Sequence, residues 1–89
     1  MQVKFRQKFD KDLDNILNAD VLNAIVKVIE LVEKVSKPQD IPNLKKMSGF
    51  KSFYRIRVGN YRIGIEIDKN TVEFQRVLLR DKIYKYFPK

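Results

Sequence analysis

Three arginines in the stretch "FYRIRVGNYRIGIEI", residues 53–67, are the side chains best suited to do chemistry. Arg55, Arg57 and Arg62 each carry a planar guanidinium, whose fork of N–H donors matches two oxygens of a phosphate. The chain has no cysteine and no histidine, which excludes thiolate nucleophiles, cysteine-based metal sites and the usual general base. Any reaction here must therefore use Arg, Lys, Tyr, Asp or Glu.

The same stretch predicts two antiparallel strands around a two-residue turn at Gly59-Asn60. Glycine at the first turn position favours a type II′ turn, which fixes the register between the strands. Because side chains alternate between the two faces of a sheet, one face is predicted to be apolar and to form the core. That face contains Tyr54, Ile56, Val58, Tyr61, Ile63, Ile65 and Ile67.

The opposite face contains the arginines. Arg57 is predicted to lie directly across from Arg62, and a like-charged pair in that position costs up to about 1 kcal/mol. Gly64 is predicted to leave a space opposite Arg55, because glycine has no side chain. We interpret this face as a binding site for a planar or anionic ligand, and we favour phosphate as that ligand. A plain solvated face is the alternative.

The distribution of charge also indicates an anionic partner. Residues 1–43 hold seven basic and seven acidic residues, whereas residues 44–89 hold twelve basic and four acidic ones, which accounts for the whole net charge of +8. Solubility alone does not require so much charge on so small a domain. We therefore expect nucleic acid or an acidic protein to meet the C-terminal half.

Hydrophobic periodicity places these residues in a β-α-α-β-β-β order. A short strand at 2–6 precedes a helix at 8–18 and a second helix that runs to about residue 36, with Asp20 as its expected N-cap. Prolines bracket the loop that follows, and a basic connector at 44–51 leads to strands at 52–58, 61–67 and 71–78, the last with a bulge near Gln75-Arg76. The expected fold is α+β, a helix hairpin against an antiparallel meander, in a single domain spanning 1–89.

No stretch approaches the roughly 20 apolar residues of a membrane span, and the N-terminus lacks the apolar core of a signal peptide. We therefore expect a cytoplasmic protein without a membrane partner. The apolar residues of the C-terminal segment, Ile83, Tyr84, Tyr86 and Phe87, are expected to dock back on the sheet.

Residues 44–88 resemble the RelE/ParE superfamily of toxin–antitoxin toxins, on its RelE-like side. The resemblance rests on the connector Leu44 to Gly49, the motif "YRIRVGNYR" at 54–62, and then Arg80, Tyr84 and the "KYFP" end. The predicted order of strands and helices extends it to nearly the whole chain. It implies a ribosome-dependent, metal-independent mRNA endonuclease without a cofactor, in which the 2′-OH attacks the adjacent phosphate.

The resemblance also implies roles for single residues. Arg62 matches the position that holds the scissile phosphate, and Arg55 and Arg57 match basic positions implicated in proton transfer or phosphate stabilisation. Arg80 matches a leaving-group position, and Tyr84 a tyrosine that stacks on or orients the RNA. Further RNA contacts are expected from the basic residues near this face, which are Lys45, Lys46, Lys51, Arg76 and Lys82.

Two departures from the family pattern predict weak cleavage. Leu79 stands where relatives often carry histidine, and Arg55 and Arg57 stand where some carry lysine. Arginine stays charged at neutral pH and is a poor base, so the proton acceptor would be Tyr84, a lysine such as Lys82, or a group of the ribosome.

The resemblance further implies partners. These are the ribosome with its mRNA and a cognate antitoxin whose acidic or amphipathic segment wraps the toxin in a hetero-oligomer. The alternatives are a ParE-like poison of DNA gyrase, which shares the fold, and a nucleic-acid-binding module without catalysis.

Overall fold

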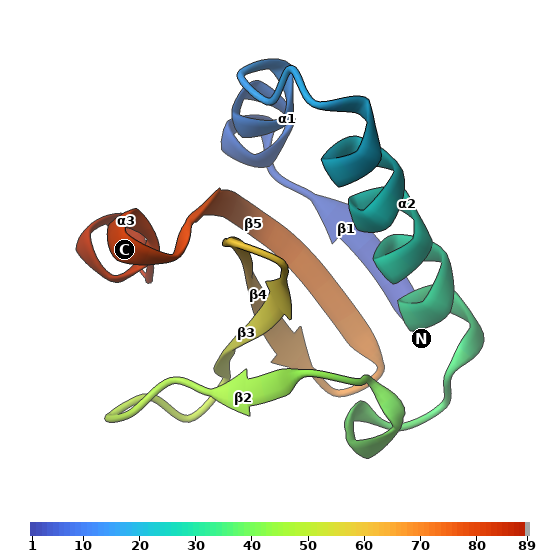
Figure 1. The fold of residues 1–89 in the computed structure, drawn as a ribbon. Helices are drawn as coiled ribbons and strands as arrows, with labels where there is room; N and C mark the ends of the chain where they lie inside the picture. Colours follow the sequence, from blue (N-terminus) through green and yellow to red (C-terminus); the bar gives the residue numbers. More distant parts are fainter. Residues whose placement is uncertain (89) are drawn as a thin grey trace.

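The structure, a computed structural model, describes residues 1–88 and contains one five-stranded sheet and three α-helices (Figure 1). A short 3-10 helix, η1, at Pro38–Asp40 separates the helix hairpin from the rest of the sheet. The elements in chain order are β1 Gln2–Phe5, α1 Gln7–Asp14, α2 Ala19–Lys34, η1, β2 Leu44–Lys46, β3 Phe53–Val58, β4 Tyr61–Asp68, β5 Thr71–Leu79 and α3 Arg80–Tyr86.

The strands lie in the order β1-β5-β4-β3-β2. β1 pairs with β5 in parallel, because the chain crosses over through α1 and α2 before it returns to the sheet, and the other neighbours are antiparallel. The predicted α+β order is confirmed. Two elements are added to it, since the basic connector forms the edge strand β2 and the C-terminal segment forms α3.

The hairpin of β3 and β4 has the predicted register. Val58 lies opposite Tyr61, Arg57 opposite Arg62 and Arg55 opposite Gly64. Of the two turn residues only Gly59 has a positive φ, at 58°, as a type II′ turn requires.

The core lies between the apolar face of the sheet and the two N-terminal helices. Phe9 of α1 and Ile25 and Val32 of α2 are fully buried, and so are Ile63 and Ile65 of β4. Figure 1 shows α1 and α2 together on this side of the sheet. The other face is covered by the part of the connector that follows β2 and by α3.

The second helix differs from its expected bounds at both ends. Its N-cap is Asn18 and not Asp20, because the Asn18 amide oxygen accepts hydrogen bonds from the backbone N–H groups of Asp20 and Val21 at 2.8 and 3.2 Å. The helix ends at Lys34, since Val35 is already extended. Within residues 1–88, no helix is both long and apolar enough to cross a membrane.

The predicted bulge in β5 is confirmed. The register shifts so that Arg76 pairs with Gly64 and Phe74 pairs with Ile65, which leaves Gln75 without a partner on β4. The buried Gln75 amide donates instead to the carboxylates of Glu66 and Glu73 at 3.1 and 2.7 Å. Because of this extra residue, Phe74 and Val77 both point to the core face although they are three positions apart.

Candidate functional site

The space predicted opposite Arg55 is filled from within the chain. A Cβ on Gly64 would lie 2.7–2.8 Å from three atoms of the Phe87 ring, and Phe87 is only 3% exposed. The prediction of a vacancy for a ligand is therefore wrong. Glycine is required here because the ring of a distant residue packs directly on the backbone of β4.

Phe87 belongs to a second, small core on the arginine side of the sheet. Its buried members are Met47, Ile83 and Phe87, with Phe53 and Leu78 packed against them. The rings of Phe53 and Phe87 meet edge to face at 5.6 Å. This core holds α3 on the sheet and so places the exposed side of α3 beside the arginines.

Four arginines from three elements form an arginine cluster, defined as Arg55 and Arg57 of β3, Arg62 of β4 and Arg80 at the start of α3. Partial desolvation lowers the pKa of Arg62 below its ordinary value, and the positive charge of Arg55 lowers it further. Arg57 and Arg80 act in the same direction, while Tyr84 opposes them. The other four residues expected to be catalytic thus lie within electrostatic reach of Arg62.

Arg62 is anchored at the hairpin turn. One terminal nitrogen, Nη1, donates to the carbonyl oxygens of Gly59 and Tyr61, both at 2.9 Å. Within residues 1–88, the other N–H groups of this guanidinium have no protein acceptor, so they are available to an anion.

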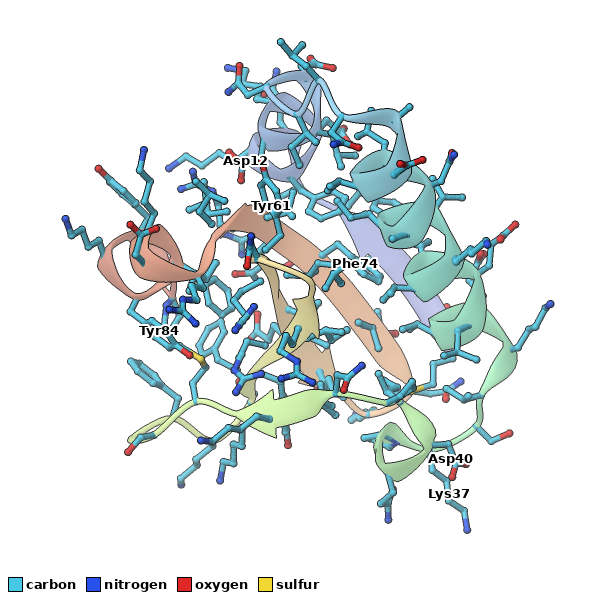
Figure 2. All side chains as sticks on the ribbon, in the orientation of Figure 1. Asp12, Lys37, Asp40, Tyr61, Phe74 and Tyr84 are labelled. Carbon is cyan, nitrogen blue, oxygen red and sulfur yellow. The ribbon has the colours of Figure 1, made fainter. Side chains whose placement is uncertain are left out.

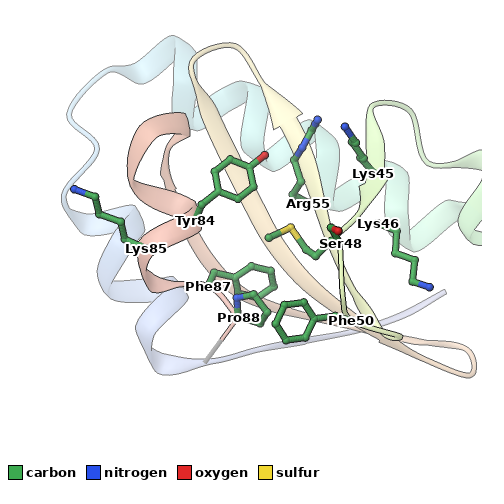
Figure 3. Close-up of a pocket in the computed structure, with 10 residues that line it drawn as sticks. Lys45, Lys46, Ser48, Phe50, Arg55, Tyr84, Lys85, Phe87 and Pro88 are labelled. Atoms are coloured by element: carbon green, nitrogen blue, oxygen red, sulfur yellow. The ribbon is translucent and has the colours of Figure 1, made fainter.

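Arg55 links two hollows on this face. One, of about 330 Å³, is lined by Arg55, Arg57 and Arg62 with Lys45, and the other, of about 400 Å³, contains Tyr84. The Nε of Arg55 is buried and has no hydrogen-bond partner among the described residues. Figure 3 shows the Tyr84 hydroxyl pointing toward Arg55.

The lysines expected to contact RNA lie in different places. Lys45 lies directly across from Arg55 in the sheet and lines both hollows, whereas Lys46 is at the rim of the larger one (Figure 3). Lys51 is exposed in the connector. Lys82 lines a separate hollow with Asp12 and other residues, so the structure does not bring it to the arginine cluster.

Arg76 is held in an ion pair instead of joining the cluster. Its Nε and Nη2 donate to the two carboxylate oxygens of Asp12 at 2.8 and 3.1 Å, and its guanidinium carbon lies 5.8 Å from the Tyr86 ring centre. The hydrogen bond to Asp12 raises the pKa of Arg76, against the opposing effect of desolvation. Figure 2 shows Asp12 on α1, facing the end of β5.

The larger hollow also has an aromatic side, which the sequence pattern did not predict. Met47, Phe50, Phe87 and Pro88 line it together with Tyr84. Phe50 is 42% exposed although it is a large apolar residue. The available signal was an aromatic residue directly after Gly49 in a connector otherwise rich in lysine.

Comparison with known proteins decides the family. The sequence model of the ParE toxin family, described as the toxin of the type II toxin–antitoxin system parDE, matches residues 3–84. This chain belongs to that family. It is a RelE/ParE superfamily toxin, as the sequence resemblance indicated.

Individual relatives support the assignment. The chain is 43% identical to Toxin RelE3 of Methanocaldococcus jannaschii over 89 residues, which cover 99% of this chain and all of that protein. It superposes on a chain of the RelB-RelE antitoxin-toxin complex from Methanococcus jannaschii with a TM-score of 0.81 at 40% identity, covering 96% and 99% of the two chains. The archaeal RelE-RelB complex from Pyrococcus horikoshii OT3 shares the fold, with a TM-score of 0.72 at 18% identity and coverage of 89% and 93%.

Proposed function

We propose that this toxin is a ribosome-dependent mRNA endonuclease that needs no metal ion. The observation that carries the proposal is the arginine cluster. Arg55, Arg57 and Arg62 line one hollow, Arg55 and Tyr84 line the adjoining one, and Arg80 lies within electrostatic reach of Arg62. Cleavage of a phosphodiester requires mainly that the phosphate be positioned and its developing charge stabilised, and fixed guanidiniums supply both.

In the proposed reaction the 2′-oxygen of one ribose forms a bond to the adjacent phosphorus while the bond from phosphorus to the 5′-oxygen breaks. The 2′-OH loses its proton and the leaving 5′-oxygen gains one, which yields a 2′,3′-cyclic phosphate and a 5′-OH. The free N–H groups of Arg62 hold the scissile phosphate, while Arg55 and Arg57 stabilise its charge. Arg80 stabilises the leaving oxygen and Tyr84 orients the RNA.

Lys45 is the lysine that the fold places next to these groups, across the strands from Arg55. We assign it, in place of Lys82, as the chain's own proton acceptor together with the Tyr84 hydroxyl. The chain has no histidine, the usual general base, so the proposed cleavage is slow unless a ribosomal group takes the proton.

Substitution of Arg62 tests this function. Translating ribosomes with a defined mRNA are exposed to the wild-type protein, to Arg62→Ala and to Lys34→Ala, a lysine on α2 that serves as a charge-matched control. Primer extension should show new 5′ ends with the wild type and with Lys34→Ala, and a loss of at least about a hundredfold with Arg62→Ala. Inhibited DNA gyrase with intact mRNA would overturn the proposal in favour of gyrase poisoning.

We further propose that a cognate antitoxin covers the arginine cluster with an acidic segment. The net charge of +8 supports this, because all of the excess lies in residues 44–89, and opposite charge steers association. Adding the antitoxin should weaken RNA binding to the toxin, measured by fluorescence anisotropy. Equal RNA affinity with and without bound antitoxin would contradict it.

A further inference from the structure

The larger hollow beside the arginine cluster has a composition that the cluster does not explain. We call it the aromatic groove and define it by Met47, Phe50, Tyr84, Phe87 and Pro88 (Figure 3). Its volume of about 400 Å³ falls within the roughly 300–1,000 Å³ of sites for small organic groups. Phosphate binding does not require the four apolar or aromatic side chains of Met47, Phe50, Phe87 and Pro88, nor the ring of Tyr84.

Local structure holds Phe50 at the mouth of this groove. The backbone N–H of Phe50 donates to the carbonyl of Met47 at 3.2 Å, and Gly49 has a φ of 83°. This is a β-turn whose third residue must tolerate the left-handed region, hence glycine. The Phe50 ring meets Phe53 at 90° with 5.7 Å between centres, so it is braced against the small core while 42% of the residue stays exposed.

Tyr84 lies on the other side of the groove, on the exposed surface of α3, and is 59% exposed. Two exposed rings, one from the connector and one from α3, therefore border a floor of buried Met47 and Phe87. Exposed aromatic rings that frame a cavity are a recurrent means of binding the flat faces of nucleobases.

The aromatic groove is continuous with the arginine cluster. Arg55 and Lys45 line both the groove and the hollow that contains Arg57 and Arg62. A polymer whose phosphate rests on the cluster must place a neighbouring unit near Arg55. A nucleotide fits this arrangement, because its base can stack on the aromatic rings while its phosphate binds the basic side chains.

We propose that the aromatic groove is a nucleobase subsite, in which the base adjacent to the phosphate on the arginine cluster is held against Phe50. The proposal rests on the proposed function in so far as the ligand is single-stranded RNA. It adds a residue, Phe50, that acts by stacking and carries no charge. Such a site would bind intact RNA more tightly than RNA that lacks the base at one position, although the two RNAs have the same phosphates.

Binding of short RNA to the full-length protein tests the subsite. Fluorescein-labelled hexanucleotides, either intact or with one abasic residue at each position in turn, are titrated with wild-type protein and with Phe50→Ala at low salt. The abasic residue should weaken binding to the wild type about tenfold at one position. Phe50→Ala should weaken binding of the intact RNA by a similar factor and abolish the abasic penalty at that position. Phe50→Trp should restore both.

Tyr86→Ala is the matched control, because Tyr86 is an aromatic residue whose exposure is similar to that of Phe50 but which lies beside Arg76, outside the groove. It should retain the abasic penalty. Circular dichroism melting of Phe50→Ala checks the fold, and Phe50→Leu, which keeps an apolar side chain without a ring, should also lose the penalty.

The outcomes separate this subsite from the proposed function. Equal binding of intact and abasic RNA by the wild type, or no binding of RNA at low salt, overturns the nucleobase subsite even where mRNA on the ribosome is cleaved. A penalty at one position that vanishes in Phe50→Ala, with no cleavage on the ribosome, supports the subsite and overturns the endonuclease.

Discussion

At the scale of single residues, the fold keeps the like-charged side chains of the arginine cluster close together despite their mutual repulsion. Arg57 and Arg62 lie directly across two strands, and the neighbouring guanidiniums contribute to lowering the pKa of Arg62. The fold holds the four guanidiniums in place by anchoring Arg62 at the hairpin turn and by beginning α3 at Arg80. A bound phosphate would relieve this repulsion, so the arrangement favours an anion before any base is considered.

Gly64→Ala is expected to destabilise the protein by about 1–3 kcal/mol, because the new methyl group overlaps the Phe87 ring. Urea denaturation followed by circular dichroism measures the change. The double variant Gly64→Ala with Phe87→Leu should cost less than the sum of the two single variants, since the smaller side chain makes room for the methyl group. Additive costs, or an unchanged midpoint in Gly64→Ala, would show that the ring does not pack on this backbone.

At the scale of elements, α1 completes an edge that β1 is too short to cover. β1 pairs with β5 only as far as Phe74. Beyond it the Asp12 carboxylate accepts a hydrogen bond from the backbone N–H of Val77 at 3.0 Å, and the same carboxylate holds Arg76. A side chain of α1 thus replaces a missing strand and fixes the end of β5 from which α3 begins.

Asp12→Ala is therefore expected to cost about 3 kcal/mol or more, because it leaves a buried N–H and a mostly buried guanidinium without an acceptor. Arg6→Ala is the comparison, since the ion pair of Arg6 with Glu73 is more exposed. Its expected cost is below about 1 kcal/mol. Thermal and urea denaturation measure the loss in free energy of unfolding for both variants. Equal losses would mean that the Asp12–Arg76 pair stabilises the fold no more than the exposed Arg6–Glu73 pair.

At the scale of the whole molecule, the net charge belongs to one half of the chain. Residues 1–43, which contain β1 and the helix hairpin, carry no net charge, and residues 44–89 carry all of it. On the arginine side the small core around Phe87 closes the centre of the sheet. The arginine cluster, Lys45 and the exposed rings of Phe50 and Tyr84 lie around this small core, along two adjoining hollows. Under the proposed function this part of the surface is the polyanion-binding face.

RNA affinity should consequently fall steeply with salt. For single strands each neutralised phosphate contributes a slope of about −0.7 in log K against log salt. Arg62→Ala should weaken binding and reduce the magnitude of the slope by about 0.7, whereas Lys34→Ala on α2 should leave it unchanged. Anisotropy titrations at four or five salt concentrations give these slopes. A similar change in slope for Lys34→Ala would argue against a single face.

Features that depend on near neighbours in the chain could be predicted from the sequence. The turn at Gly59 and the two-residue period fixed the register of β3 and β4 and the side on which the arginines lie, and the broken alternation near Gln75 located the bulge. Such features follow from short-range geometry, which a local pattern encodes directly. Even there Asn18, and not Asp20, caps α2, because asparagine and aspartate are both good N-caps and the two residues are only two positions apart.

The surroundings of the arginines depend on long-range packing and could not be predicted from the sequence. The Phe87 ring packs on Gly64, and Arg76 pairs with Asp12, 64 residues earlier in the chain. Phe50 and Tyr84 lie on either side of one groove. These contacts join segments far apart in sequence. Each is settled only when the helix hairpin, the sheet and α3 pack together, so no periodicity within one segment contains them.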